Sequence, residues 1–254
     1  MGQKPSHAPS IPILELRTCL ERLFIEKLNF ERIVLSNQQN IELLRIQSSC
    51  DFSKARRLEF LDVSGGPAPS ALSRLKKLRY FDTSGTIPGN LDGLCNLETL
   101  IMRKCRVTPM FGDLHRLRKL DVSLSEEISD ERTVFSQLPL LEVLIANGTP
   151  ITGSGFEYLT KLRKLEVKQC KYLNIEKNAR MRALLELNAR NSAMTDKTLS
   201  NMENLRVLNV SETCILGKAF KCLTKLTKVN VRSCPNLKRK YLKKLKSRGI
   251  RLKK

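Results

Sequence analysis

The chain has 254 residues and carries 46 Lys and Arg against 25 Asp and Glu, a formal net charge of +21. No apolar run approaches the roughly 18 residues that a membrane-spanning helix needs, and the start of the chain lacks the long apolar segment of a secretory signal. We therefore expect an intracellular protein, located in the cytoplasm or in the nucleus and nucleolus and not secreted.

Residues 1–40 are expected to form a tail and a capping helix. Pro5, Pro9 and small polar residues in the first ten positions are typical of a loose tail. After Pro12, apolar residues recur at helical spacing. They are Ile13, Leu16, Leu20, Leu23 and Phe24. Such a helix can cover the open end of a repeat array, whose terminal units have a neighbour on one side only.

The start of the chain, Met1-Gly2-Gln3-Lys4-Pro5-Ser6, matches the N-myristoylation pattern, with Gly2 as the acceptor once Met1 is removed. One myristoyl chain gives only marginal, reversible membrane binding and needs a second signal such as a basic patch. The motif predicts a peripheral membrane contact through Gly2, and a chance match stays open as the alternative.

One spacing pattern recurs along residues 41–235. A Leu or Ile is followed by apolar side chains three and five positions later (+3 and +5) and by a small Ser, Thr or Cys at +8, where Gly66 is the exception. The pattern begins at Ile41, Leu58, Leu78, Leu97, Leu117, Leu141, Leu162, Leu184, Leu205 and Leu226. Ten copies with a period near twenty positions are typical of leucine-rich repeats.

Within each copy the apolar +3 and +5 positions alternate with polar ones, which predicts a short strand. The small side chain at +8 fits inside the turn that follows, where its hydroxyl or thiol can bond free backbone groups. Segments such as 70–76 and 155–161 suit short helices. The sequence therefore predicts an α/β solenoid: a leucine-rich-repeat horseshoe of about ten repeats, with a parallel sheet on its concave side and short helices or irregular turns on its convex side.

The repeats Leu141-Glu-Val-Leu-Ile-Ala-Asn-Gly-Thr149 and Leu205-Arg-Val-Leu-Asn-Val-Ser-Glu-Thr213 resemble leucine-rich repeats of the cysteine/threonine type. More narrowly, the chain is similar to kinetoplastid leucine-rich-repeat proteins, including those described as adenylate cyclase regulators. Some of these carry a RING segment, for which this chain lacks the cysteines and histidines. The resemblance implies a binding scaffold for a protein partner, with a membrane-associated regulator as the alternative.

The chemistry-bearing residues argue against catalysis. The eight cysteines form no C-x-x-C pair and there are two histidines, so a zinc site is poorly supported. Cys105, Cys170 and Cys234 stand at +8 positions and are expected to be reduced structural thiols. Asp62 and Asp82 could form a carboxylate pair, but no histidine or third ligand converges on them. We expect no enzyme, no cofactor and no small-molecule substrate.

The strand pattern predicts which side chains face the concave side, because the positions +2, +4 and +6 alternate with buried ones. This face runs from acidic and aromatic to basic along the chain. The candidate protein-binding residues are Phe60, Asp62, Tyr80, Asp82, Asp121, Lys164, Lys168, Arg190, Lys228 and Arg232.

Residues 236–254 are expected to form a basic C-terminal cap. From Gly217 to Lys254 there are 15 Lys and Arg and no acidic residue. Leu237, Tyr241, Leu242 and Leu245 share one helical face, and Ile250 and Leu252 could add a last half-strand. The opposite face carries Lys238, Arg239, Lys240, Lys243, Lys244 and Lys246. We predict contact with an anionic partner, RNA or a ribonucleoprotein rather than lipid, against the alternative of a merely solvated basic end.

Overall fold

A computed structural model describes residues 32–34, 58–65, 72–85, 90–106, 111–112, 114–128, 132–175 and 181–253. Gly2, the predicted N-terminal tail and capping helix up to residue 31, and the first predicted repeat at Ile41 lie outside these residues. The described ranges therefore cover, with gaps, the predicted repeats from Leu58 onward and the C-terminal cap.

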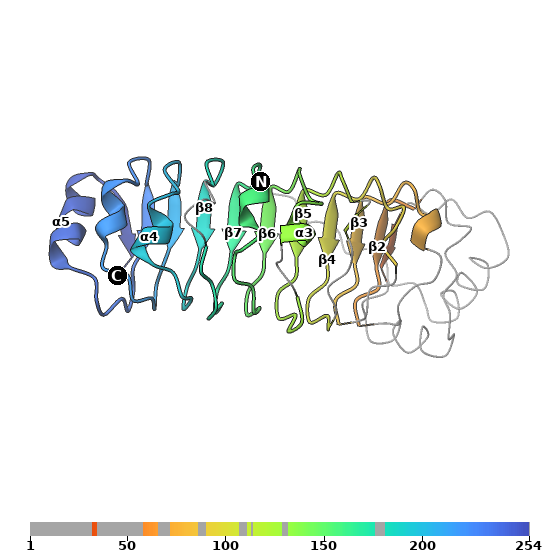
Figure 1. Cartoon of the computed structure of the whole chain (residues 1–254), viewed down its shortest axis with the longest axis horizontal. Helices are drawn as coiled ribbons and strands as arrows, with labels where there is room; N and C mark the ends of the chain where they lie inside the picture. Colours follow the sequence, from red (N-terminus) through yellow and green to blue (C-terminus); the bar gives the residue numbers. More distant parts are fainter. Residues whose placement is uncertain are drawn as a thin grey trace, which may run out of the picture.

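The described strands form one parallel sheet in which each strand pairs with the next along the chain (Figure 1). Every strand is short. The strands are β1 (Arg32–Val34), β2 (Phe60–Asp62), β3 (Tyr80–Asp82), β4 (Thr99–Ile101), β5 (Lys119–Asp121), β6 (Val143–Ile145), β7 (Lys164–Glu166), β8 (Glu186–Asn188), β9 (Val207–Asn209), β10 (Lys228–Asn230) and β11 (Arg251–Lys253). This arrangement confirms the predicted parallel solenoid.

The two ends of the sheet bear on the predicted repeat boundaries. β1 occupies the sheet position beside β2. β1 consists of residues 32–34 and therefore precedes the first predicted repeat, which begins at Ile41. The boundary at residue 41 stays a prediction. At the other end β11 pairs with β10, in agreement with the half-strand expected at 250–252.

Buried and more exposed side chains alternate along the strands of the repeats, which explains how such short strands can build a core. From β2 to β10 the middle side chain, at +3, points inward and is fully or nearly fully buried, as for Leu61, Phe81 and Leu165. The leading Leu of each described repeat is buried as well, so every repeat adds at least two large apolar side chains to one continuous core. Because each unit buries its apolar face against its neighbours, the array grows in one direction.

The wall opposite the sheet is made of irregular turns and short helices, as predicted. The helices are η1 (Leu72–Arg74), α3 (Arg132–Phe135), η2 (Phe156–Tyr158), α4 (Asp196–Leu199) and η3 (Lys218–Lys221). η2 and α3 pack through Phe156 and Phe135, whose ring centroids lie 5.6 Å apart. Both side chains are buried in the core.

A left-handed backbone conformation follows each described strand from β2 to β10. It occupies the +7 position, with φ between 51° and 76°. Glycine fills this position at Gly65, Gly85 and Gly148, where the missing Cβ removes the steric cost. The other repeats place larger side chains there, namely Lys104, Leu124, Gln169, Asn191, Glu212 and Ser233. Apart from Asn191, whose side chain tolerates this region, the surrounding turn therefore imposes a conformation that costs about 1–2 kcal/mol for each residue.

The small side chains at +8 hold this turn in place. The hydroxyls of Thr149, Ser192 and Thr213 each donate to the carbonyl three positions earlier in their own repeat, at 2.7 Å. The Cys170 thiol donates to the Ala146 carbonyl of the preceding repeat at 3.0 Å, and Cys234 contacts Val210 in the same way. Neighbouring side chains at +8 thus share one carbonyl. Their predicted role is confirmed.

The C-terminal cap closes the core with α5 (Arg239–Ser247) and β11. Tyr241 and Leu245 of α5 are buried, in agreement with their helical spacing. Arg248 belongs to the basic end of the sequence, yet its guanidinium donates to the carbonyls of Phe220 (3.0 Å), Leu223 (2.7 Å) and Thr224 (2.8 Å). Arg248 therefore binds the cap to the end of η3, where such carbonyls lack helical partners.

We predict that Thr213→Val lowers the free energy of unfolding by about 1–2 kcal/mol, because valine keeps the shape but leaves the buried Val210 carbonyl with one donor fewer. Urea denaturation followed by circular dichroism measures the change. Thr160→Val, which replaces an exposed threonine, is the matched control and should alter stability by less than about 0.5 kcal/mol. Equal effects of the two substitutions would contradict the role given to the hydroxyl at +8.

Candidate functional site

The side chains at +2, +4 and +6 of successive repeats form three rows on the concave side of the sheet, here called the concave face. Each side chain predicted for protein binding lies in one of these rows. Phe60, Tyr80, Lys164 and Lys228 occupy +2 positions, and Asp62, Asp82 and Asp121 occupy +4 positions. Lys168, Arg190 and Arg232 lie at +6, just beyond their strands. The contacts of these side chains distinguish structural groups from those available to a partner.

Phe60 and Tyr80 form an aromatic platform near the N-terminal end of the described face. β2 and β3 pair in a register that sets the two side chains next to each other. Their rings stack with centroids 4.1 Å apart and planes 5° from parallel. Both are half-buried. The pair therefore offers a flat, rigid apolar surface of the kind that interfaces use as an anchor.

Asp62 and Asp82 beside this platform serve the turn. Their Oδ1 atoms accept the backbone N–H of Ser64 at 3.1 Å and of Ser84 at 2.9 Å. Burial, and secondarily the nearby Asp62 charge, raise the pKa of Asp82 above its ordinary value, although the Ser84 hydrogen bonds oppose the shift. Among the described residues no group of three His, Cys, Asp or Glu could hold a metal ion. The two carboxylates thus have a structural use.

Asp121 differs from its prediction as a surface contact because its side chain is only 1% exposed. Its Oδ1 accepts from the backbone N–H (3.1 Å) and hydroxyl (2.7 Å) of Ser123, and its Oδ2 accepts from Arg103 Nε at 2.7 Å. The hydrogen bond to Asp121 raises the pKa of Arg103 above its ordinary value. Arg103, which stands at +6 of its repeat but is not among the predicted residues, is the member of this pair that reaches solvent.

Two predicted lysines flank a carboxylate. Lys164 Nζ lies 3.0 Å from Glu166 Oε1, and Lys168 Nζ lies 3.5 Å from Glu166 Oε2. Burial pushes the pKa of Glu166 upward, but the two lysines outweigh it and hold the pKa below its ordinary value. Arg190 is paired with Glu212 at 2.9 Å. The middle of the concave face is therefore closer to neutral than the predicted gradient from acidic to basic.

Apolar side chains outside the predicted set lie between these charges. Val143 and Ile145 of β6 are half-buried on the concave face, and Ile101 of β4 is almost fully buried. Along the edge where the chain enters the strands, exposed ion pairs join neighbouring repeats. One joins Arg79 to Glu98 at 2.9 Å, and another joins Arg118 to Glu142. The face thus combines an apolar centre with a charged rim.

The basic cap is defined by Lys238, Arg239, Lys240, Lys243, Lys244 and Lys246, all of which are exposed or half-exposed. None of the six forms an ion pair with another described residue. Lys240 Nζ lies 5.2 Å from the ring centroid of Tyr241, which is itself 7% exposed. Tyr241 is consequently placed to fix the helix on the repeats and not to stack on a base.

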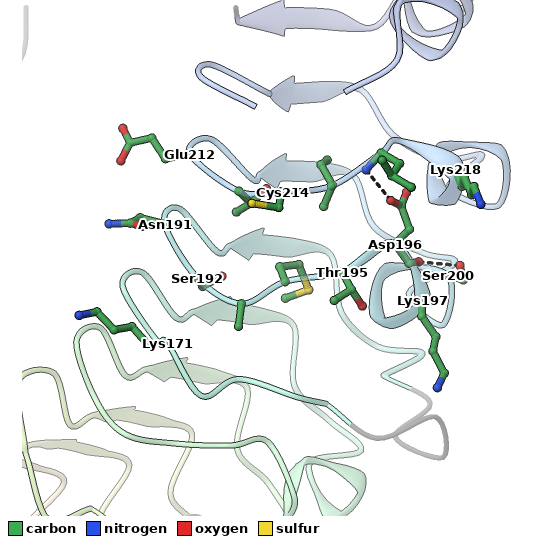
Figure 2. A pocket seen from close by; sticks show the side chains of 15 residues that line it. Lys171, Asn191, Ser192, Thr195, Asp196, Lys197, Ser200, Glu212, Cys214 and Lys218 are labelled. Carbon is green, nitrogen blue, oxygen red and sulfur yellow. Dashed lines mark hydrogen bonds between the residues drawn. The ribbon is translucent and has the colours of Figure 1, made fainter. Parts of the chain in front are cut away.

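A groove of about 790 Å³ opens on the edge where the chain leaves β8 and β9 (Figure 2). Met194 and Ile215 contribute buried apolar side chains to it. The Asp196 carboxylate accepts three backbone N–H groups, from Leu216 at 2.7 Å, Gly217 at 3.2 Å and Ala219 at 2.8 Å. Asp196 thereby joins α4 to the start of η3. In Figure 2 the Lys197 and Lys218 side chains point outward, away from the Asp196 carboxylate.

Similarity to solved structures identifies the fold. An internalin (InlF) from Listeria monocytogenes is 18% identical with a TM-score of 0.57, covering 73% of this chain and 61% of its own. The functional domain of Listeria monocytogenes InlJ is 18% identical with a TM-score of 0.62, covering 82% and 50%. The mouse RP105/MD-1 complex gives 18% identity and a TM-score of 0.63, covering 90% and 45%. These neighbours are leucine-rich-repeat proteins. The chain has a leucine-rich-repeat fold.

No family model and no curated protein matches the chain. The leucine-rich-repeat chain spans about half the length of the solved structures it resembles, from 38% to 61%. The narrower resemblance to kinetoplastid proteins stays a prediction. Within the ranges that the structure describes, the helices lack the length and the apolar character of a membrane span.

We predict that Asp82→Asn stabilises the protein at pH 7 by up to about 1 kcal/mol. Because the folded state raises the Asp82 pKa, it binds this proton more tightly than the unfolded chain does. The contribution of Asp82 to the free energy of unfolding therefore falls as the pH rises from its unfolded-state pKa through its higher folded-state pKa. An asparagine cannot ionise and avoids this loss, while its oxygen still accepts from Ser84. Urea denaturation between pH 3 and pH 7 measures the difference, which should vanish at the acid end. Asp92→Asn, at an exposed carboxylate, is the control, and the same pH profile in both variants would disprove the interpretation.

Proposed function

We propose that this chain is a non-catalytic leucine-rich-repeat scaffold whose concave face binds a protein partner. One observation carries the proposal: the concave face is a continuous surface with an aromatic platform, an apolar centre and a rim of charged pairs. From β2 to β11 it extends for nine strand intervals of about 4.8 Å, or about 43 Å. That length suits a protein interface of standard size, which buries about 800 Å² on each partner.

The composition of the face supports this proposal. Protein interfaces are anchored by aromatic and apolar side chains and surrounded by polar ones. Here the anchors would be Phe60, Tyr80 and the apolar pair of β6, with Arg103 and Lys164 around them. The mouse RP105 structure, one of the fold neighbours, is a complex with MD-1, which also supports a protein-binding use of the fold.

The contacts of the acidic side chains support a non-catalytic role. Asp62, Asp82 and Asp121 accept backbone N–H groups of the turns that follow them. General acid–base catalysis needs a group within hydrogen-bond reach of the proton it transfers, together with partners that orient it. The concave carboxylates are instead bound to the scaffold itself, so a binding surface accounts for their positions better.

We predict that Tyr80→Ala reduces capture of the concave-face partner at least about tenfold, because it removes half of the stacked platform. Quantitative mass spectrometry after affinity purification of the tagged chain from its native cell provides the measurement. Tyr172→Ala is the matched control, since Tyr172 is 68% exposed and lies outside the three concave rows. Retention of all partners by Tyr80→Ala, or equal losses in both variants, would contradict binding at this face.

A second function, binding of an anionic polymer by the basic cap, is favoured by a separate observation. The six basic side chains project from a helix anchored by Tyr241, Leu245 and Arg248, so their charges form a fixed patch rather than a flexible tail. We propose RNA or a ribonucleoprotein as the partner. Base-stacking side chains are scarce there, and phosphate contacts should dominate. The competing function is a membrane-associated regulator held by a lipidated Gly2 and the basic cap, in which case Gly2→Ala should leave the membrane fraction.

We predict that the basic cap binds a 20-nucleotide oligo(U). The logarithm of the binding constant should fall linearly with the logarithm of the salt concentration, with a slope of about −0.7 per phosphate neutralised. Replacing Lys238, Arg239, Lys243 and Lys244 by Gln, here called the cap variant, should flatten that slope without loss of the folded repeats. The control replaces Lys77, Lys104, Arg116 and Lys161 by Gln, an equal change of charge on other repeats. An unchanged slope in the cap variant, or binding only to phosphatidylserine vesicles, would overturn RNA binding by the cap.

A further inference from the structure

The +4 row of the concave face changes its chemistry between the two halves of the sheet. In β2, β3 and β5 the row holds aspartates, whereas in β9 and β10 it holds Asn209 and Asn230. Both kinds of side chain make the same turn. Asn209 Oδ1 accepts the N–H of Ser211 at 3.1 Å, and Asn230 Oδ1 accepts the N–H of Arg232 at 3.2 Å. The turn therefore uses one side-chain oxygen in each of these repeats.

The second polar atom of each +4 side chain, which the turn does not use, is a donor in asparagine and an acceptor in aspartate. A backbone N–H can only donate, so the amide atom that it contacts must be the oxygen, and the remaining atom of each asparagine is the Nδ2 donor group. In an aspartate the remaining atom is an anionic acceptor, as Oδ2 of Asp121 is for Arg103. Among the described residues, no acceptor meets Nδ2 of Asn209 or of Asn230. β9 and β10 thus present donors at +4 through Asn209 and Asn230, where β2 and β3 present the acceptors of Asp62 and Asp82.

These two amides line a small groove together with basic side chains. The groove has a volume of about 240 Å³ and is lined by Arg190, Asn209, Ser211, Glu212, Asn230, Arg232 and Lys253. Lys253 stands beside Asn230 in the pairing of β11 with β10. The one carboxylate, Glu212, accepts from Arg190 Nε at 3.0 Å and pairs with its Nη2 at 2.9 Å. The lining side chains thus carry three formal positive charges, on Arg190, Arg232 and Lys253, and one negative charge, on Glu212.

We propose that this groove of the concave face binds an acidic or phosphorylated side chain of a protein partner. The proposal rests on the proposed scaffold function and specifies which chemistry the partner brings to the C-terminal end of the face. Arginine and amide N–H donors are suited to the oxygens of a carboxylate or phosphate. No aromatic side chain lines the groove for base stacking, and its volume suits one compact group. Lys228 and Arg251 in the neighbouring +2 row strengthen the attraction.

The test uses the full chain and three fluorescein-labelled hexapeptides: one of glutamates, one of phosphoserines and one of glutamines. Fluorescence anisotropy at about 50 mM salt should show binding of both anionic peptides over the neutral one. The double variant Asn209→Asp/Asn230→Asp keeps the oxygen that the turn needs and replaces each free donor by an anionic acceptor. It should bind both anionic peptides at least about tenfold more weakly. Asn90→Asp/Asn174→Asp, an equal change of charge at exposed asparagines, should bind them within about twofold of the unchanged chain.

The relative affinities separate the two sources of the anion. Tighter binding of the phosphoserine peptide assigns the groove to phosphate, and similar affinities assign it to carboxylates. Equal binding of the neutral peptide, unchanged binding by the Asn209→Asp/Asn230→Asp variant, or loss of binding only in the cap variant would overturn the proposal. Oligo(U) that displaces the glutamate peptide from the cap variant would also overturn it in favour of nucleic acid. If the groove fails this test but partner capture still depends on Tyr80, the groove proposal is wrong and the proposed scaffold function is unaffected.

Discussion

The turn that ends each strand is the constraint on which the rest of the structure depends. A strand this short has few ladder hydrogen bonds, so the chain needs other partners for the backbone groups it exposes on leaving the sheet. The backbone turns left-handed at +7, and the hydroxyl or thiol at +8 then bonds a carbonyl inside the core. Because Thr213 and Cys234 both reach the Val210 carbonyl, this turn connects neighbouring repeats as well as completing its own.

The same turn determines what the concave face can do. It takes one oxygen from most of the aspartates and asparagines at +4, which leaves a single side-chain atom of each for other contacts. In Asp121 that atom is anionic, and Arg103 of the preceding repeat covers it. Where it is an amide nitrogen, as in Asn209, it stays available to a ligand. A position fixed by the fold can therefore differ in binding chemistry without a change in backbone.

Much of the architecture can be predicted from one sequence, because spacing alone encodes the strands, the buried leucines and the hydrogen-bonding side chains at +8. The pairings across repeats cannot. Arg103 reaches Asp121 from 18 positions away, and Arg248 reaches Phe220 from 28, and no local period signals either contact. The left-handed +7 position also escapes prediction, because side chains such as Leu124 and Glu212 fill it in place of glycine. Lys164 and Lys168 do lie on the concave face, but their shared partner Glu166 reduces the charge they present.

Chemical footprinting of the captured complex tests most directly whether the concave face is the binding surface. Lysines can be labelled in the free chain and in the chain bound to its partner, and the modified sites read by mass spectrometry. Binding at this face predicts reduced labelling of Lys119, Lys164 and Lys228, which share the +2 row, and unchanged labelling of Lys77 and Lys161, which precede the strands. Protection confined to Lys77 and Lys161, with the concave lysines labelled as in the free chain, would contradict it.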